Sequence, residues 1–166
     1  THETSQARDL FQSEEEAGTL DEDGMGSIVR AAGRLKSFRG HGKTAFGHLE
    51  DGTGTLQVYF RKDALGEEAF QTIMDLVDLG DWIGVEGPLF RTRTGEITVR
   101  ASDWHFLAKS LRPLPYGKSE EDPETGERIV HSGFSDIEAR YRQRYADLAV
   151  HPEVRDVFRA RTRMVT

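Results

Sequence analysis

The chain has 166 residues, no cysteine and a formal net charge of −7. The lack of cysteine excludes disulfides and thiolate metal sites, and it fits a reducing, cytoplasmic location. No apolar run approaches the ~20 residues that span a bilayer, so we expect no membrane partner. Because the chain begins at Thr1 without a methionine, we expect it to be a fragment of a longer protein.

The negative charge is concentrated near the N-terminus. Residues 1–27 hold eight acids and one base, whereas residues 28–109 hold eleven of each. Five bases with no acid among them fall in residues 30–43, namely Arg30, Arg34, Lys36, Arg39 and Lys43. A local basic segment can attract phosphate even when the whole chain is acidic. Taken alone, this segment is explained equally well as a solvated charged face.

The first 26 residues are acidic and contain glycine. A short helix is predicted from Thr4 to Phe11, with its apolar end docking on the rest of the protein. A loop or linker is predicted from Glu14 to Gly26. Residues 1–26 are therefore expected to form an acidic segment that precedes the first domain.

Residues 27–109 are predicted to form that domain. Apolar and polar residues alternate in five stretches, which is typical of half-buried strands. The predicted strands are residues 27–37, 44–50, 55–60, 82–90 and 96–101. A flexible basic turn is predicted at residues 39–43, and apolar residues recur every three or four positions from Leu65 to Val77, which predicts a helix. Three strands, a helix and two strands are the order of the OB-fold, a five-stranded Greek-key barrel that binds oligonucleotides. We therefore expect a mainly β protein.

The remaining residues differ in composition. Residues 110–134 contain prolines that prevent regular strand pairing and many polar residues, so a linker and loop are predicted. Residues 135–166 are predicted to be helical. Ser135 begins a capping-box pattern, and a second helix is expected to start near Pro152.

Several side chains on the polar side of the predicted strands suit a nucleobase. Phe46, His48, Gln57 and Tyr59 lie there, and an aromatic ring on a wet sheet face beside basic residues can stack a base. Gln57 offers a donor and an acceptor to a base edge. Glu96 accepts an N–H and repels phosphate, so it suits a base rather than the backbone. The alternative of ordinary surface residues, with Phe46 tucked under a loop, stays open at this point.

No catalytic or metal site is predicted. The six histidines are scattered without metal-ligand spacing. Residues 40–43, Gly-His-Gly-Lys, lack the spacing of a phosphate-binding P-loop. No Ser/His/Asp arrangement is present. We therefore assign no catalytic residue and no metal ligand in the chain.

Longer stretches of the sequence resemble a known family. Residues 29–60 share a G-R…G-K…F…D-G-T-G…Q outline with the anticodon-binding barrel of class IIb aminoacyl-tRNA synthetases, including the aspartyl and asparaginyl members. Residues 78–96 contain DLGD and LFRTRTGE, residues 107–115 read LAKSLRPLP, and residues 138–148 read EARYRQRYADL. These later stretches are similar to the lysyl member, and the resemblance extends over residues 27–166.

The resemblance implies a function for the barrel. It would bind the U-rich anticodon of lysine tRNA, and Arg39, Phe46, Gln57 and Glu96 match family positions that contact anticodon bases, with Phe46 stacking on the central uridine. Residues 135–166 would begin the class II catalytic domain, including part of the first class II motif at the dimer interface.

The resemblance also implies a parent enzyme. It would be a homodimeric lysine-tRNA ligase that uses ATP and Mg²⁺ to activate lysine and then transfers it to the tRNA. The later class II motifs are outside the 166 residues, so the fragment itself is expected to be non-catalytic, with neither cofactor bound. Two alternatives remain at this stage: the anticodon domain of an aspartyl- or asparaginyl-tRNA synthetase, and a free-standing OB-fold binder of single-stranded nucleic acid.

Overall fold

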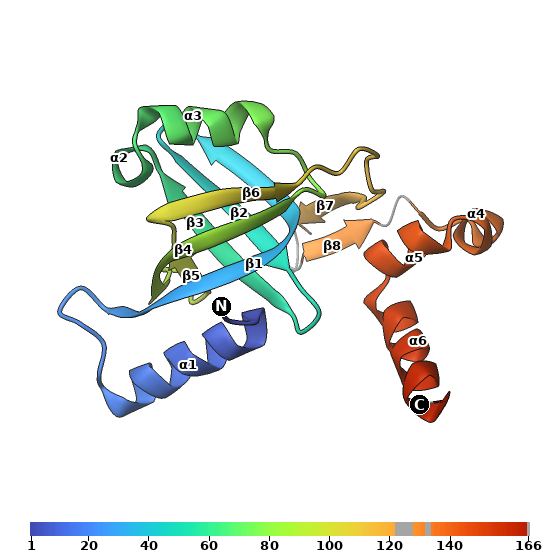
Figure 1. Ribbon diagram of the computed structural model, residues 1–166, viewed down its shortest axis with the longest axis horizontal. Coiled ribbons are helices and arrows are strands. Elements are labelled where there is room, and N and C mark those ends of the chain that lie inside the picture. The colour runs from blue at the N-terminus through green and yellow to red at the C-terminus, as the bar shows by residue number, and fades with distance from the viewer. Residues whose placement is uncertain (122–127, 132–133, 166) are drawn as a thin grey trace. The chain divides into compact units, whose positions relative to one another are not determined.

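The computed structural model describes residues 1–121, 128–131 and 134–165 (Figure 1). The chain divides into two compact units, Thr1–Leu111 and Arg112–Thr166. The elements of the first unit are α1 (Thr4–Ala17), β1 (Met25–His41), β2 (Thr44–Glu50), β3 (Thr55–Arg61), α2 (Lys62–Leu65), α3 (Glu67–Leu76), β4 (Trp82–Arg91), β5 (Ile97–Arg100) and β6 (Asp103–Ala108). Those of the second unit are β7 (Lys118–Glu121), β8 (Arg128–His131), α4 (Ile137–Arg142), α5 (Arg144–Val150) and α6 (Pro152–Val165).

The sheet of the first unit closes on itself as a barrel. Its strands follow the order β1-β2-β3-β5-β4, and additional pairing between β1 and β4 closes the ring. The β3–β5 pair is parallel and the other pairs are antiparallel. β6 lies on the same side of β4 as β5 does, so the two form a fifth strand that is broken between them. The predicted five-stranded OB-fold is confirmed.

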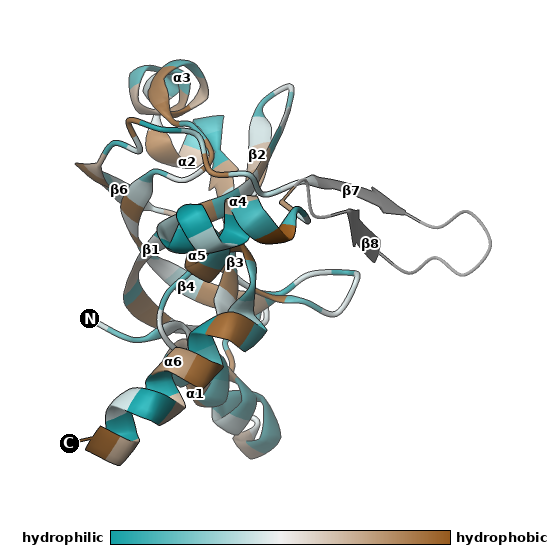
Figure 2. Cartoon of the chain, turned by 90° about the vertical axis from the view of Figure 1, so that its right-hand side faces the viewer, coloured by the Kyte–Doolittle hydropathy of each residue, from teal (hydrophilic) through white to brown (hydrophobic). Residues whose placement is uncertain are grey.

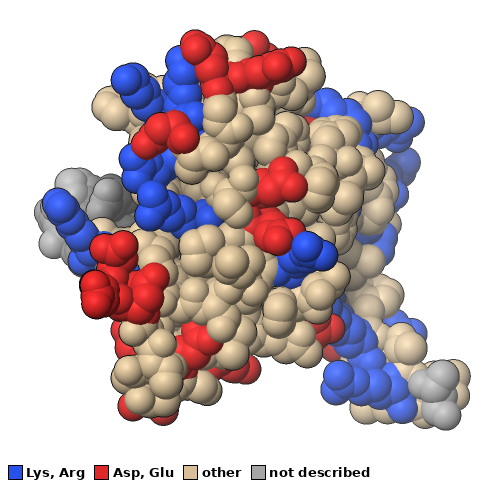
Figure 3. Space-filling model, turned by 60° about the vertical axis from the view of Figure 1, so that its left-hand side comes forward, with Lys and Arg blue, Asp and Glu red and all other residues tan. Residues whose placement is uncertain are grey.

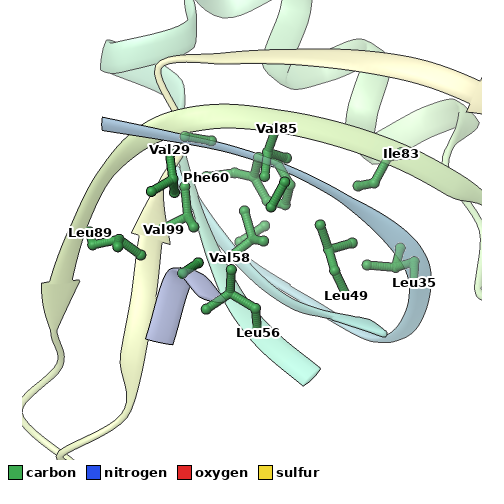
Figure 4. Packing of buried hydrophobic residues seen from close by; sticks show 14 of the residues in the cluster. Val29, Leu35, Leu49, Leu56, Val58, Phe60, Ile83, Val85, Leu89 and Val99 are labelled. Carbon is green, nitrogen blue, oxygen red and sulfur yellow. The ribbon is translucent and has the colours of Figure 1, made fainter. Parts of the chain in front are cut away.

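The inward side of the barrel is built from the predicted apolar positions. Side chains from all of the barrel strands point into one cluster (Figure 4). The largest fully buried members from β1, β2, β3 and β4 are Leu35, Leu49, Phe60 and Ile83. Alternate residues on each strand face opposite sides of a sheet, so this buried set leaves the intervening polar side chains on the outer face.

The first strand is longer than predicted. The basic turn expected at residues 39–43 lies mostly in β1, where Arg39 pairs with Phe46 and His41 pairs with Thr44. Only Gly42 and Lys43 form the turn. A register shift between Leu35 and Ser37 changes the alternation at this point, which is why the pattern of residue types did not predict the extension.

The helix predicted from Leu65 to Val77 is interrupted. Gly66, with φ 86° and ψ 159°, separates α2 from α3 in a backbone conformation that is essentially restricted to glycine. α3 buries Phe70 and Ile73 against the barrel but leaves Leu76 exposed. The predicted amphipathic helix is therefore confirmed from Glu67 to Leu76, and Gly66 separates it from Leu65 at the end of α2.

The N-terminal helix is also longer than predicted. α1 continues to Ala17, so the first part of the loop expected from Glu14 to Gly26 is helical. Ala7 and Phe11 are fully buried in the same cluster as the barrel strands. α1 and α3 lie at opposite ends of the barrel (Figure 1).

The start of α1 is attached to the β2–β3 turn through a carboxylate. The Thr4 backbone N–H donates to Asp51 Oδ2 at 2.7 Å, and the Thr4 hydroxyl donates to Asp51 Oδ1 at 2.8 Å. The backbone N–H of Thr53 also donates to Asp51 Oδ1, at 2.7 Å. Burial raises the pKa of Asp51, but these hydrogen bonds outweigh it and lower the pKa from 3.8 to about 2.

We expect this attachment to weaken in acid. Because the pKa of Asp51 is lower in the folded state, its stabilising contribution is complete above pH 3.8 and is lost as the pH falls through about 2. The contribution is at most about 2.5 kcal/mol, and solvent screening of the partly exposed carboxylate reduces it. Urea unfolding should show Asp51→Asn less stable than the parent at pH 7 but nearly equal to it near pH 2. The exposed control Asp23→Asn should match the parent at both pH values, and an undiminished Asp51→Asn deficit in acid would contradict the assignment.

The second unit departs from the prediction at its start. β7 and β8 form an antiparallel pair within residues 110–134, which were predicted to be a linker and loop. Residues 122–127 and 132–133 of that region lie outside the described residues. α4 is capped by Asp136, whose carboxylate accepts from the Ala139 N–H at 2.7 Å, and not by Ser135. α6 begins at Pro152 as predicted, and hydrophobic and hydrophilic residues interleave along it (Figure 2). No helix in the described ranges is long and apolar enough to span a membrane.

Candidate nucleic-acid interface

The outer face of the barrel brings the predicted binding residues into two neighbouring rows. Strand register places Arg39, Phe46, Tyr59 and Arg100 side by side across β1, β2, β3 and β5. The next row consists of Ser37, His48, Gln57 and Thr98 on the same four strands. Glu96 lies in the turn just before β5, although it was predicted within the strand.

Phe46 forms part of an aromatic surface on this face. Its ring stacks on Tyr59 with centroids 4.4 Å apart and planes inclined by 22°. Tyr59 in turn lies 6.1 Å from Phe90 in a tilted arrangement. Phe46 is 37% exposed, so the ring is neither inside the barrel nor covered by a loop. A ring supported from one side and accessible to solvent is suited to stack an unpaired base.

A chain of hydrogen bonds runs through the neighbouring row. Ser37 Oγ lies 2.7 Å from His48 Nδ1, and His48 Nε2 lies 2.8 Å from Glu96 Oε1. Gln57 Nε2 donates to the other Glu96 oxygen at 2.6 Å. The Thr98 hydroxyl donates to Gln57 Oε1 at 2.7 Å. Two residues predicted to read bases, Gln57 and Glu96, are thus bonded to each other.

Thr98 lies in the outer row beside Gln57 but is fully buried. Its neighbours in the sheet are Gln57 on β3 and Phe90 on β4, and their long side chains cover the shorter threonine. Because a buried hydroxyl needs a hydrogen-bond partner, the Gln57 carbonyl is held towards Thr98.

The predicted basic segment does not act as one surface. Three of its five cations are engaged locally: Arg30 pairs with Glu86 at 2.6 Å, Lys36 pairs with Glu50 at 2.7 Å, and Arg34 lies 5.1 Å from the centre of the Trp82 ring. Acidic and basic side chains alternate in small groups on the face shown in Figure 3. Within the described residues, the side chains of Arg39 and Lys43 make no ion pair, and both are exposed. These two cations are therefore available to a phosphate group, and Arg39 lies directly opposite Phe46 in the strand register.

The structure adds Ser37 and Thr98 to the site, neither of which the residue pattern identified. They lie at the two ends of the hydrogen-bond chain, and His48, which the pattern already placed on this face, lies within it. Their contacts depend on the register of four strands and on the irregularity in β1. The outward position of His48 was the only sequence signal for its role.

The barrel has the sequence features of a known family. Residues 29–107 match the family of OB-fold nucleic acid binding domains. The closed barrel and its aromatic outer face agree with this match, and the barrel belongs to that class of nucleic-acid-binding domains.

The similarity to curated proteins extends beyond the barrel. Lysine-tRNA ligase from Aquifex aeolicus is 47% identical over 138 residues, which are 83% of this chain and 21% of the ligase. The lysine-tRNA ligase of Christiangramia forsetii is 47% identical over 144 residues, 84% of this chain and 24% of the ligase. That of Carboxydothermus hydrogenoformans is 47% identical over 137 residues, 82% of this chain and 25% of the ligase. These similarities support an N-terminal anticodon-binding region of a lysyl-tRNA synthetase, and the chain spans about a quarter of these relatives' length.

Proposed function

We propose that the outer face of the barrel binds the anticodon of lysine tRNA. The supporting observation is the exposed Phe46 ring, which lies beside the bonded Gln57–Glu96 pair. Phe46 stacks on an anticodon base, Gln57 and Glu96 contact base edges, and Arg39 contacts the anticodon next to Phe46. The carboxylate favours a base over a phosphate as its neighbour because it repels the backbone.

The parent protein is, in this proposal, a cytoplasmic lysine-tRNA ligase that works as a homodimer. It forms lysyl-tRNA from lysine, ATP and tRNA, with Mg²⁺ as cofactor. The names of the relatives and their greater length support this proposal. They also favour a lysine enzyme over the aspartyl and asparaginyl alternatives and over a free-standing binder.

We assign a separate role to each successive segment of the chain. Residues 1–26 precede the anticodon-binding domain of residues 27–109, residues 110–134 connect it to the next domain, and residues 135–166 begin the catalytic domain. The 166 residues bind RNA without catalysing a reaction, and no catalytic residue is assigned among them. ATP and Mg²⁺ act in the part of the parent enzyme that carries the later class II motifs.

Replacing Phe46 with alanine tests the proposed site. Phe46→Ala should weaken binding of a lysine anticodon stem-loop by roughly 1–3 kcal/mol, the usual contribution of one stacked base. Fluorescence anisotropy with labelled stem-loops measures this change. Circular dichroism should show a nearly unchanged melting curve, because Phe46 lies outside the buried cluster.

An exposed phenylalanine elsewhere on the barrel provides the control. Phe106 on β6 is also solvent-exposed, but it lies outside the two rows of the proposed site. Phe106→Ala should leave stem-loop affinity unchanged. Equal losses in the two variants, or equally tight binding of lysine and aspartate stem-loops by the parent chain, would refute the proposed function.

A further inference from the structure

The hydrogen-bond chain gives His48 a role beyond that of a surface histidine. We propose that His48 is a positioning residue that orients the Glu96 carboxylate for base recognition and thereby determines specificity rather than overall affinity. This inference rests on the proposed anticodon-binding function. It concerns a side chain that does not itself need to touch the RNA.

His48 is held in one orientation by contacts at both ring nitrogens. Ser37 Oγ lies 2.7 Å from Nδ1, and Glu96 Oε1 lies 2.8 Å from Nε2. The side chain is only 23% exposed, in contrast to the 44% exposure of Glu96. The His48 ring is mostly covered and is held by Ser37 on β1. It can therefore hold the more exposed Glu96 carboxylate in the turn before β5.

Glu96 is held on its other side by Gln57. The Gln57 amide donates to Glu96 Oε2 at 2.6 Å, while the Gln57 carbonyl accepts from Thr98 at 2.7 Å. These bonds determine which way the amide points, since its nitrogen faces the carboxylate and its oxygen faces Thr98. The second amide hydrogen and the free lone pairs of Glu96 remain available to a base.

Loss of the His48 contact would remove one of the two hydrogen bonds that the Glu96 carboxylate accepts from neighbouring side chains. An exposed glutamate in a turn then samples more rotamers, and base binding must order it again. Stacking on Phe46 and attraction to Arg39 and Lys43 do not depend on this contact. The expected consequence is a lower preference for the correct base, with little change in binding to unrelated RNA.

Two substitutions at His48 distinguish the loss of its hydrogen-bond donor from a change in side-chain volume. His48→Leu keeps an apolar volume but removes the donor to Glu96. His48→Gln keeps an N–H donor at the same position along the side chain, since both donors are ε nitrogens. Dissociation constants are measured for a lysine anticodon stem-loop and for the same loop with its central uridine replaced by cytidine.

We expect His48→Leu to reduce the ratio of the two dissociation constants about tenfold, the effect of losing one hydrogen bond to a charged group. His48→Gln should retain most of the ratio, and both variants should bind unrelated single-stranded RNA like the parent. An unchanged ratio in His48→Leu, or an equal loss of affinity for every RNA, would overturn the proposal.

A measurement without RNA keeps the two proposals distinguishable. Nuclear magnetic resonance of the Gln57 side-chain amide, assigned by its loss in Gln57→Glu, reports the bond to Glu96. The signal should move towards the position of a free glutamine in His48→Leu and stay near the parent position in His48→Gln. An unmoved signal in His48→Leu refutes the positioning role. A parent chain that shows the expected signals but does not prefer the lysine stem-loop refutes the proposed function instead.

Discussion

Gly87→Ala is expected to destabilise the barrel by about 3 kcal/mol or more, because the added methyl group has no space. A Cβ at this position would lie 2.0 Å from the Arg100 carbonyl oxygen and 2.8 Å from its carbonyl carbon. Both are backbone atoms, so no side-chain rotation relieves the overlap. Gly87 faces the point where β5 ends and the chain turns into β6, and the close approach lets one broken strand pair with β4 on both sides of the break.

The same strand contains a matched control. A Cβ on Gly84 would meet nothing nearer than Leu107 Cδ1 at 3.7 Å, which is an ordinary van der Waals contact. Gly84→Ala should therefore change the free energy of unfolding by well under about 1 kcal/mol. Urea unfolding can be followed by tryptophan fluorescence, because Trp82 and Trp104 both lie in the first unit. Similar midpoints for the two variants would show that β4 tolerates a side chain at Gly87, opposite the end of β5.

Asp81→Asn is expected to cost about 3 kcal/mol, because it removes the charge from a buried and fully bonded carboxylate. Asp81 accepts from the backbone N–H of Asp78 at 2.8 Å, from Lys109 Nζ at 2.8 Å and from the Ser110 N–H at 2.7 Å. Burial raises the pKa of Asp81, but these three donors outweigh it and hold the pKa below its usual value. An asparagine can offer only one oxygen to the three donors.

Asp78→Asn is the control for the charge on the same lysine. Asp78 also pairs with Lys109, but its side chain is 76% exposed. An exposed pair contributes about 0–1 kcal/mol, so this variant should remain close to the parent in urea. Equal destabilisation by the two substitutions would mean that the Asp81 cluster contributes no more than a surface ion pair. The cluster matters for the architecture because Lys109 and Ser110 are near the end of the first unit, at Leu111.

The two stability predictions and the proposed binding site involve different parts of the first unit. Gly87 and the buried cluster allow the barrel to close, and closure sets the register that aligns Phe46 with Tyr59 and Gln57 with Thr98. We therefore expect variants of the outer face to change binding without unfolding the chain. Variants at Gly87, where β4 approaches the end of β5, should unfold the barrel and lose binding together.

The local pattern of residue types in the sequence was sufficient to predict much of the fold. The alternation in residues 44–50 and 55–60 correctly predicted that Leu49 and Phe60 face inward and that Phe46 faces outward. The switch to a helical period near Phe70 correctly predicted the element between the third and fourth strands. These features follow from neighbours along the chain, because a strand buries every second residue and a helix buries one side.

Contacts between distant residues decided the rest. The bulge after Leu35 aligns Ser37 with His48, the cover provided by Gln57 and Phe90 buries Thr98, and the turn before β5 brings Glu96 to both His48 and Gln57. The sequence by itself predicted a barrel with an aromatic side chain on its polar face and a resemblance to lysyl-tRNA synthetases. Only the tertiary structure determined the hydrogen-bond chain beside that ring, because strand register and side-chain cover depend on pairings between different strands, some of them about 40 or more residues apart.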